Sequence, residues 1–237
     1  MWFSSARRRH QVPADCFVIG PDSVQPIDCV RDLGLYLDTT MSMREHICRL
    51  TSTCFGVLRQ IRTIRRCLTS RARNTLVTCF VFARLDYCNS AFAGLSRCDL
   101  DRLQAVQNAA VRLVAGARKY DHVTPLLRDK HWLPVEQRIH FKIAVTVYKC
   151  LHGLSADYLS DFTRPSTAST VYSQRLRSAD RQQLYVPRSN TRMGDRSFAV
   201  AGPSTWNRLP ATVTAAPSLA VFKKQLKTFL FAEAYSV

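Results

Sequence analysis

The sequence predicts a mainly α-helical protein: an antiparallel helical bundle, preceded by a short β segment and followed by an irregular region and a terminal helix. Three observations support this fold class. Apolar residues recur every three or four positions between residues 42 and 115, which is the period of amphipathic helices. The first 40 residues contain short apolar or alternating runs that are typical of strands. Residues 163–216 are rich in Ser, Thr and Arg, and helical periodicity returns in residues 217–237.

Residues 1–40 form the expected β segment. The run CFVIG (16–20) and the alternation in DLGLYLD (32–38) indicate short strands, three at most. We expect the triplet Arg7, Arg8 and Arg9 at the tip of a hairpin. A sheet this small needs packing from other elements to be stable.

Residues 41–118 are expected to fold as three helices joined by short turns, and such helices pack as an antiparallel bundle. Ser42 and Glu45 fit a capping box for a first helix that runs to about residue 68. Thr69 and Ser70 start the second helix. Ser96 caps a third, from about residue 99 to 115, which ends at a glycine suited to the left-handed conformation.

Residues 119–162 should add further helices packed on the bundle. Thr124 with Pro125 indicates one helix start and Pro134 a second, because proline is favoured in the first helical turn. Trp132 and Leu133 lie between these helices and are expected to wedge into the bundle. We expect an irregular segment over 163–216, with short strands at 183–186 and 198–200, and an amphipathic helix over 217–237.

The charge balance points to an anionic partner. The chain has 34 Lys and Arg against 17 Asp and Glu, a formal net charge of +17. Such an excess is typical of proteins that bind nucleic acid or acidic surfaces, although a basic protein without such a partner is an alternative. No apolar run reaches about 20 residues, so no membrane partner is expected.

Nine cysteines without a C-x-x-C pair indicate small buried hydrophobic residues in a reducing, intracellular compartment, either nucleus or cytoplasm. Neither the cysteine nor the histidine spacings match a zinc site, and no Gly-rich phosphate loop is present. We therefore predict no metal, no cofactor and no small-molecule substrate.

A dense group of cations surrounds the junction of the first two helices. Cations in the first turn of a helix oppose the helix dipole, so this cluster is not placed for local helix stability. Phosphate contact is the favoured interpretation, and plain solvated charge is the alternative. The candidate nucleic-acid-binding residues are Arg59, Arg62, Arg65, Arg66, Arg71 and Arg73, with Lys119 as a further candidate.

Five segments, in this order, resemble one family: RDLGLYLD, FVFARLDYCNSAFAGL, LQAVQNAAVRLVAG, HWLPVEQRIHFKI and FAVAGPSTWNRLP. Together they resemble the C-terminal part of reverse transcriptases from LINE-type (non-LTR) retrotransposons of the jockey-like kind. The resemblance implies that residues 1–40 are the end of the palm, that 41–118 are the thumb and that the remainder is a C-terminal extension. It also implies a primer-grip-like role for Leu33, Gly34, Leu35 and Tyr36.

Polymerases of this family use palm aspartates, partly in a Tyr-x-Asp-Asp turn, to hold two Mg²⁺ ions. No such motif is present, and it is expected upstream of Met1. Asp86 does not replace it, because it has no adjacent carboxylate, and Asp99 and Asp101 are interpreted as cap and first-turn charges.

The resemblance therefore implies a fragment of an RNA-directed DNA polymerase that is not an enzyme on its own. The expected partners are the backbone of RNA or of an RNA–DNA hybrid and the rest of a reverse transcriptase. Two alternatives remain: a helical protein-interaction scaffold, and the product of a decayed element with no function of its own.

Overall fold

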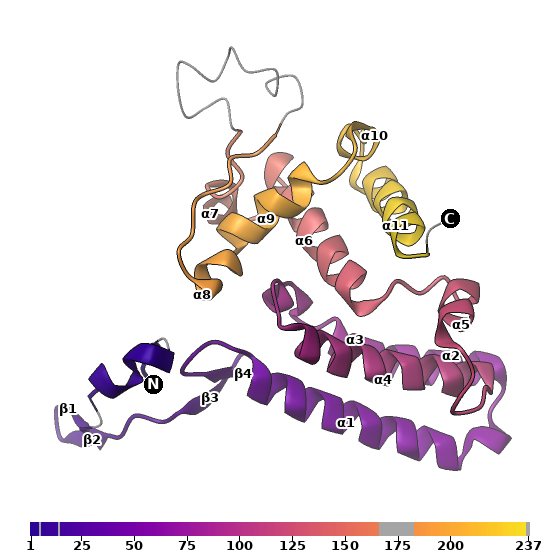
Figure 1. Ribbon diagram of the computed structural model, residues 1–237, viewed down its shortest axis with the longest axis horizontal. Coiled ribbons are helices and arrows are strands. Elements are labelled where there is room, and N and C mark those ends of the chain that lie inside the picture. Colours follow the sequence, from indigo (N-terminus) through magenta and orange to yellow (C-terminus); the bar gives the residue numbers. More distant parts are fainter. Residues whose placement is uncertain (5, 14, 166–182, 236–237) are drawn as a thin grey trace.

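Helices dominate the protein, and the predicted fold class is confirmed (Figure 1). The computed structural model describes residues 1–4, 6–13, 15–165 and 183–235. Most of the expected irregular stretch before residue 183 lies outside the described residues. Two short hairpins lie at one end, a long helical bundle extends from them, and the C-terminal helices cover one side of the bundle.

The β segment consists of two antiparallel hairpins. Strand β1 (Phe17–Ile19) pairs with β2 (Asp22–Val24), and β3 (Cys29–Asp32) pairs with β4 (Leu35–Asp38). The expectation of at most three strands is therefore wrong, because every residue of the first hairpin is exposed and its polar strand β2 has no apolar alternation. The arginine triplet lies in a 3₁₀ helix, η1 (Ala6–Gln11), and not at a hairpin tip.

Helix α1 (Arg44–Thr63) starts differently from the predicted capping box. Met43, its N-cap, is left-handed at φ 63° and forms no side-chain cap. The Ser42 hydroxyl instead donates to the Asp38 carboxylate at 2.8 Å, and Glu45 pairs with Arg49 at 2.6 Å. Asp38 also accepts the backbone N–H groups of Thr40 and Ser42, so a strand-end carboxylate directs the chain into α1.

After α1 the chain turns back, antiparallel to that helix. The last long helix of the bundle then runs parallel to α1. The remaining bundle elements are η2 (Arg65–Cys67), α2 (Ser70–Val77), the π-helical turn η3 (Thr78–Phe82), α3 (Ala83–Leu85), η4 (Asn89–Phe92) and α4 (Arg97–Ala115). The predicted caps at two helix starts are confirmed. The Thr69 hydroxyl accepts a hydrogen bond of 3.2 Å from the backbone N–H of Ala72, and the Ser96 hydroxyl accepts one of 3.2 Å from the backbone N–H of Asp99. Gly116 ends α4 at φ 70°, as expected.

The bundle core is built from the apolar faces that the sequence predicts. Ile47, Cys54, Val77, Leu103 and Val106 are all fully buried in it. Burying such side chains stabilises the fold by about 1.5–3 kcal/mol each. Of the nine cysteines, all free, only Cys54 and Cys150 are buried, so the expectation of generally buried cysteines is wrong.

Helices α5 (Val123–Asp129), α6 (Val135–Leu151) and α7 (Asp157–Ser160) follow the bundle. The start of α5 lies two residues before the predicted position, with His122 as N-cap and Val123 as first helical residue, whereas Pro134 is the N-cap of α6 as expected. The predicted wedge is confirmed for Trp132, whose ring stands edge-on to Phe82 in the bundle core with centroids 4.4 Å apart. Leu133 is buried in a second core and not in the bundle.

Helices α8 (Arg192–Asp195), α9 (Phe198–Asn207) and α10 (Ala211–Thr214) lie where an irregular segment was expected, and α11 (Leu219–Tyr235) follows. The predicted strand at 198–200 is wrong, because this sequence becomes helical by packing on α6 through Gly202. A Cβ at Gly202 would lie 3.2 Å from Val147. Within 183–186, Leu184 forms only an isolated bridge with Pro165.

A second core joins α6, α9 and α11. Tyr148, Trp206 and Phe222 stack in its centre, with centroids 4.4 and 5.8 Å apart, and the Tyr148 hydroxyl donates to the Ala216 carbonyl at 3.0 Å. Across the described ranges, no helix has the length and apolar character required to cross a membrane.

Candidate nucleic-acid interface

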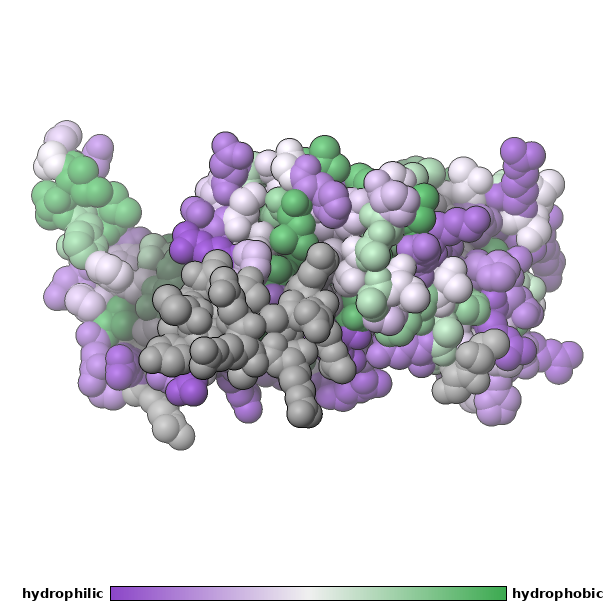
Figure 2. All heavy atoms as spheres, turned by 90° about the horizontal axis from the view of Figure 1, so that it is seen from above, coloured by the Kyte–Doolittle hydropathy of each residue, from purple (hydrophilic) through white to green (hydrophobic). Residues whose placement is uncertain are grey.

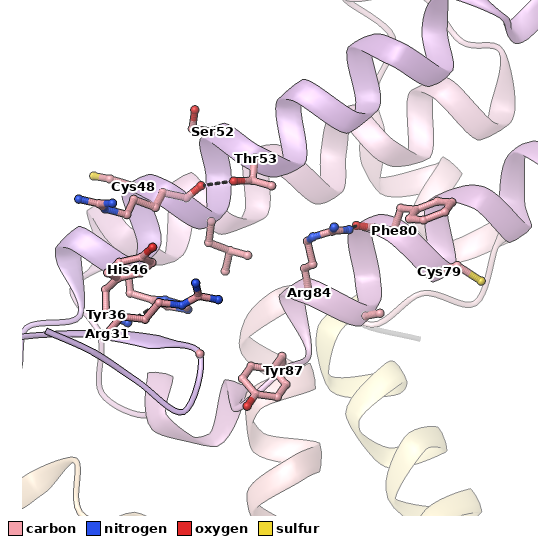
Figure 3. A pocket seen from close by; sticks show the side chains of 14 residues that line it. Arg31, Tyr36, His46, Cys48, Ser52, Thr53, Cys79, Phe80, Arg84 and Tyr87 are labelled. Atoms are coloured by element: carbon pink, nitrogen blue, oxygen red, sulfur yellow. Dashed lines mark hydrogen bonds between the residues drawn. The ribbon is translucent and has the colours of Figure 1, made fainter.

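An open groove of about 1010 Å³ lies where the β3–β4 turn meets α1, η3 and α3 (Figure 3). Three separate parts of the chain form its walls, so it exists only in the folded protein. Its described lining residues are Arg31, Gly34, Tyr36, His46, Cys48, Arg49, Leu50, Ser52, Thr53, Cys79, Phe80, Ala83, Arg84 and Tyr87.

The groove is cationic. Arg31, Arg49 and Arg84 line it, and no Asp or Glu is among the lining residues that the structure describes. The Arg49 guanidinium lies over the Tyr36 ring at 4.4 Å and also pairs with Glu45 outside the groove. The hydrogen bond from Arg49 to Glu45 raises the Arg49 pKa, so this guanidinium stays charged. Planar cations beside aromatic rings are well suited to contact phosphates and sugars.

One wall of the groove is the π-helical turn η3. In such a turn hydrogen bonds run to the fifth residue, which widens the helix, and π turns are frequent at functional sites. Phe80 is 46 % exposed here despite its size. The Arg84 guanidinium, from the following α3, donates to the Phe80 carbonyl, which holds the cation against the π-helical turn. Figure 3 shows both side chains on the groove side of this helix.

The opposite wall is the β3–β4 turn, which is fixed to the end of α3 through one side chain. The Tyr87 hydroxyl donates to the Leu33 carbonyl at 2.7 Å. Gly34, at φ 83°, lies under the same ring, and a Cβ there would be 3.3 Å from Tyr87 Cε1. A glycine is required here by both backbone conformation and close approach.

His46 forms part of the groove floor. Its Nδ1 accepts the backbone N–H of Tyr36 at 3.4 Å, and its ring lies 5.7 Å from Phe92. Burial lowers the His46 pKa, which favours the neutral imidazole that this hydrogen bond requires.

An exposed row leads from the groove along α1. Cys48, Ser52, Phe55, Arg59 and Arg62 recur at spacings of three and four residues, and all are exposed. The groove lies at the first part of this row, and the predicted arginine cluster begins at its end. Glu45 is the single acid in α1, at its start, so the row itself is free of negative charge.

The predicted cations gather at the far end of the bundle. Arg59 and Arg62 end α1, the other four predicted arginines follow in η2 and α2, and Lys119 follows α4 at the same end (Figure 1). Six of these seven residues are exposed, and none takes part in the ion pairs of the described chain. Arg73 is half-buried, and its Nε has no partner among described atoms. A helix of 20 residues is about 30 Å long, so this cluster lies roughly that far from the β3–β4 turn.

The four primer-grip-like residues divide into two groups. Gly34 and Tyr36 line the groove, and the Leu33 carbonyl holds Tyr87. Leu35 is half-buried against the bundle core and does not line the groove. The structure therefore brings two of these residues together with three arginines that were not predicted site residues.

Arg31, Arg49, Arg84 and Tyr87 are the lining residues that sequence analysis missed. A signal was available for the last two, because RLDYCN (84–89) is more polar than a helical hairpin requires. Arg31 and Arg49 carry no such signal, since isolated arginines on a strand and a helix are ordinary.

The three carboxylates that the sequence does not favour as metal ligands have structural partners. Asp86 forms a two-pronged ion pair with Arg138, with Nε 2.9 Å from Oδ1. Asp99 closes the Ser96 cap and Asp101 pairs with Arg97. Across the described ranges, no three His, Cys, Asp or Glu side chains are grouped to hold a metal ion.

Comparisons of the chain with protein-family models, with curated proteins and with solved structures find no match.

Proposed function

We propose that this protein binds the phosphate backbone of RNA or of an RNA–DNA hybrid, without catalysis of its own, through the groove and the arginine cluster along α1. The observation that carries the proposal is the groove itself: three arginines and three aromatic rings converge from three parts of the chain, with no acid among the described lining residues. A concentration of cations without nearby carboxylates favours a polyanion.

The exposed row on α1 supports a polymeric ligand over a small one. It connects the groove to the cations at the α1–α2 turn with small, aromatic and basic side chains. Gly56, which lies inside the same helix, has open space where its side chain would be. A backbone carrying one phosphate per 3.4 Å of strand would span the helix with about nine nucleotides.

The resemblance to the palm end and thumb of LINE-type reverse transcriptases supports the same proposal. Three of the five resembling segments supply the groove or its neighbourhood: RDLGLYLD forms the β3–β4 hairpin, and the segment that begins FVFARLDYC supplies Phe80, Arg84 and Tyr87. The third, HWLPVEQRIHFKI, anchors α3 through the Arg138–Asp86 pair. We propose descent from such a polymerase on these grounds, with the rest of the polymerase as a partner in binding.

The proposal is tested by fluorescence anisotropy with labelled RNA–DNA duplexes of 6 to 16 base pairs over a range of salt concentrations. We expect affinity to rise steeply until the duplex reaches about nine base pairs and to change little beyond. The Arg49→Ala/Arg84→Ala variant should bind at least about tenfold more weakly, on the order of 1.4 kcal/mol. The slope of log affinity against log salt should become shallower by about 0.9 for each phosphate that the variant no longer neutralises.

A matched control is the Arg97→Ala/Arg208→Ala variant, which removes two exposed arginines that do not line the groove. This variant should bind like the unmodified protein. Binding that does not change with salt, or an equal decrease of affinity in both double variants, would contradict the proposal. Circular dichroism of each variant shows whether a weaker binder is still folded.

A protein-interaction scaffold is the second candidate, and one observation favours it. Apolar side chains gather at the hairpin end, where Trp2, Phe3, Phe17, Val18 and Ile19 are all exposed (Figure 2). Large exposed apolar patches mark interaction surfaces. A stable protein complex that is abolished in the Val18→Asp/Ile19→Asp variant, together with absent duplex binding, would favour this candidate.

A further inference from the structure

A second pocket, of about 340 Å³, lies on the other side of α3, where the bundle meets α6 and α11. Its described lining residues are Asp86, Asn89, His131, Trp132, Leu133, Arg138, Phe141, Lys142 and Lys227. It shares no lining residue with the groove. Its size falls within the range of pockets that hold small organic ligands.

The charges of this pocket favour an anion. Arg138, Lys142 and Lys227 bring three positive charges to it, and Asp86 is its single described acid. Asp86 is already paired with Arg138. The two lysines take part in none of the described ion pairs. Like charges that converge on one cavity repel each other, and a bound anion removes that repulsion.

The remaining wall is aromatic and apolar. Trp132, Leu133 and Phe141 line it, and Trp132 is only partly buried. Inorganic phosphate alone would leave this apolar wall exposed to water. An uncharged apolar ligand would leave the positive charges of the two lysines without a counter-charge. A ligand with a planar ring and an attached anionic group satisfies both parts of the pocket.

The backbone that carries Trp132 and Leu133 is fixed by hydrogen bonds before any ligand binds. The backbone carbonyl of Trp132 accepts a hydrogen bond of 2.6 Å from the Tyr235 hydroxyl. The backbone N–H of Trp132 donates to the Leu127 carbonyl at 3.0 Å. The buried Gln107 donates to the Leu133 carbonyl at 2.8 Å. Because the loop is fixed from both sides, binding would cost little conformational entropy.

We propose that this pocket binds a nucleoside monophosphate unit, with the base on Trp132 and Phe141 and the phosphate between Lys142 and Lys227. The unit has two sources: a free mononucleotide, or the 5′-phosphorylated end of a single strand. Nucleotide binding here is independent of duplex binding at the groove, since the two sites have no residue in common.

The test is calorimetric titration of the full chain with adenosine monophosphate, adenosine and inorganic phosphate. We expect saturable binding of the nucleotide at least tenfold tighter than binding of either part. The Lys142→Ala/Lys227→Ala variant should bind the nucleotide at least tenfold more weakly. The Lys223→Ala/Lys224→Ala variant is the matched control on α11, because both lysines are exposed and line neither site.

A second titration compares single-stranded decamers with a 5′-phosphate and with a 5′-hydroxyl. Tighter binding of the phosphorylated strand, abolished in the Lys142→Ala/Lys227→Ala variant, supports the pocket and identifies the strand end as a source. The proposal is overturned if neither the nucleotide nor the 5′-phosphate shows such a preference, or if the control variant weakens binding as much. The Arg49→Ala/Arg84→Ala variant should still bind the nucleotide. This variant therefore distinguishes failure of the duplex-binding proposal from failure of the nucleotide-binding proposal.

Discussion

The Tyr87 hydroxyl donates a hydrogen bond of 2.7 Å to the carbonyl oxygen of Leu33, 54 residues earlier in the chain. This bond joins the β3–β4 turn to the end of α3 across the mouth of the groove. Among the described residues, the turn has no other side-chain hydrogen bond to this part of the chain. The bond therefore contributes to the position of Arg31 relative to Arg84, together with the packing of β4 on α1.

Replacing Tyr87 by Phe should loosen the turn with little loss of stability. Because Tyr87 is half exposed, we expect the free energy of unfolding to fall by about 0.5 kcal/mol, the low end for a hydrogen bond. Affinity for an RNA–DNA duplex should fall about threefold or more, since the turn no longer holds Arg31 in place. Urea unfolding and anisotropy measure the two effects. Tyr158→Phe, an exposed tyrosine outside the groove, is the control, and unchanged duplex affinity in Tyr87→Phe would refute the positioning role.

The Asp86–Arg138 pair should couple the bundle to the C-terminal helices. Removing either partner leaves the other partly buried without its two-pronged ion pair. A double-mutant cycle with Asp86→Asn and Arg138→Gln, followed by urea unfolding, should give a coupling energy of about 1 kcal/mol, since Asp86 is 40 % exposed and partly screened. Strictly additive effects of the two changes would show that the pair contributes no coupling.

Replacing Arg196 by lysine should lower the stability of the fold. Its guanidinium donates to the carbonyl oxygens of Met41, Ala91 and Ala93, at 2.6, 3.1 and 3.0 Å, and so ties α8 to the bundle. Burial lowers the Arg196 pKa, yet the group remains charged at any pH of interest. A single ammonium cannot reach three separated acceptors, so Arg196→Lys should cost about 2–3 kcal/mol of unfolding free energy.

Thermal or urea unfolding of Arg196→Lys measures this decrease. The control is Arg192→Lys, an exposed arginine on the same short helix, which should change stability by less than about 0.5 kcal/mol. Equal stability of the two variants would show that the three hydrogen bonds to carbonyls are dispensable.

Stability should fall on mild acidification because of one buried histidine, His46, and one half-buried histidine, His140. Burial lowers the pKa values of His46 and His140 below the ordinary value of 6.5. Between that value and the lowered folded pKa, the unfolded chain binds more protons than the folded one. The free energy of unfolding therefore decreases as pH falls below about 6.5, and levels off once the folded histidines are protonated.

Urea unfolding at a series of pH values from about 8 to 5 tests this dependence. His46→Gln should flatten part of the slope, although it will lower stability at every pH because the side chain is buried. His10→Gln, at an exposed position, should leave the slope unchanged. A slope that is the same in His46→Gln as in the unmodified chain would exclude His46 as a contributor.

Local chemistry explains what the sequence alone determined. Helix period, the caps at Thr69 and Ser96 and the glycine at 116 depend on neighbours within a few residues, so the bundle could be predicted nearly to its boundaries. The concentration of exposed arginines at the α1–α2 turn was equally predictable, because a one-sided apolar stripe leaves the charges on the solvent side.

Local patterns gave the wrong prediction at two places where a further contact decides the conformation. A carboxylate at the end of β4 replaced the capping box at Ser42, and residues 198–207 became helical because Gly202 allows close packing on α6. The second outcome depends on α6, which lies far away in the sequence, whereas Asp38 lies only four residues before Ser42 and competes with the capping box for its hydroxyl.

The two proposed binding sites were decided by tertiary structure alone. The groove combines Arg31, Arg49 and Arg84 from a strand and two helices, and the second pocket combines Lys142 with Lys227 from helices 85 positions apart. The sequence determined that this chain is basic and helical, because composition and period are properties of the chain itself. Only folding determined where the charges converge, because that depends on how the helices pack and on which side chains their cores leave exposed.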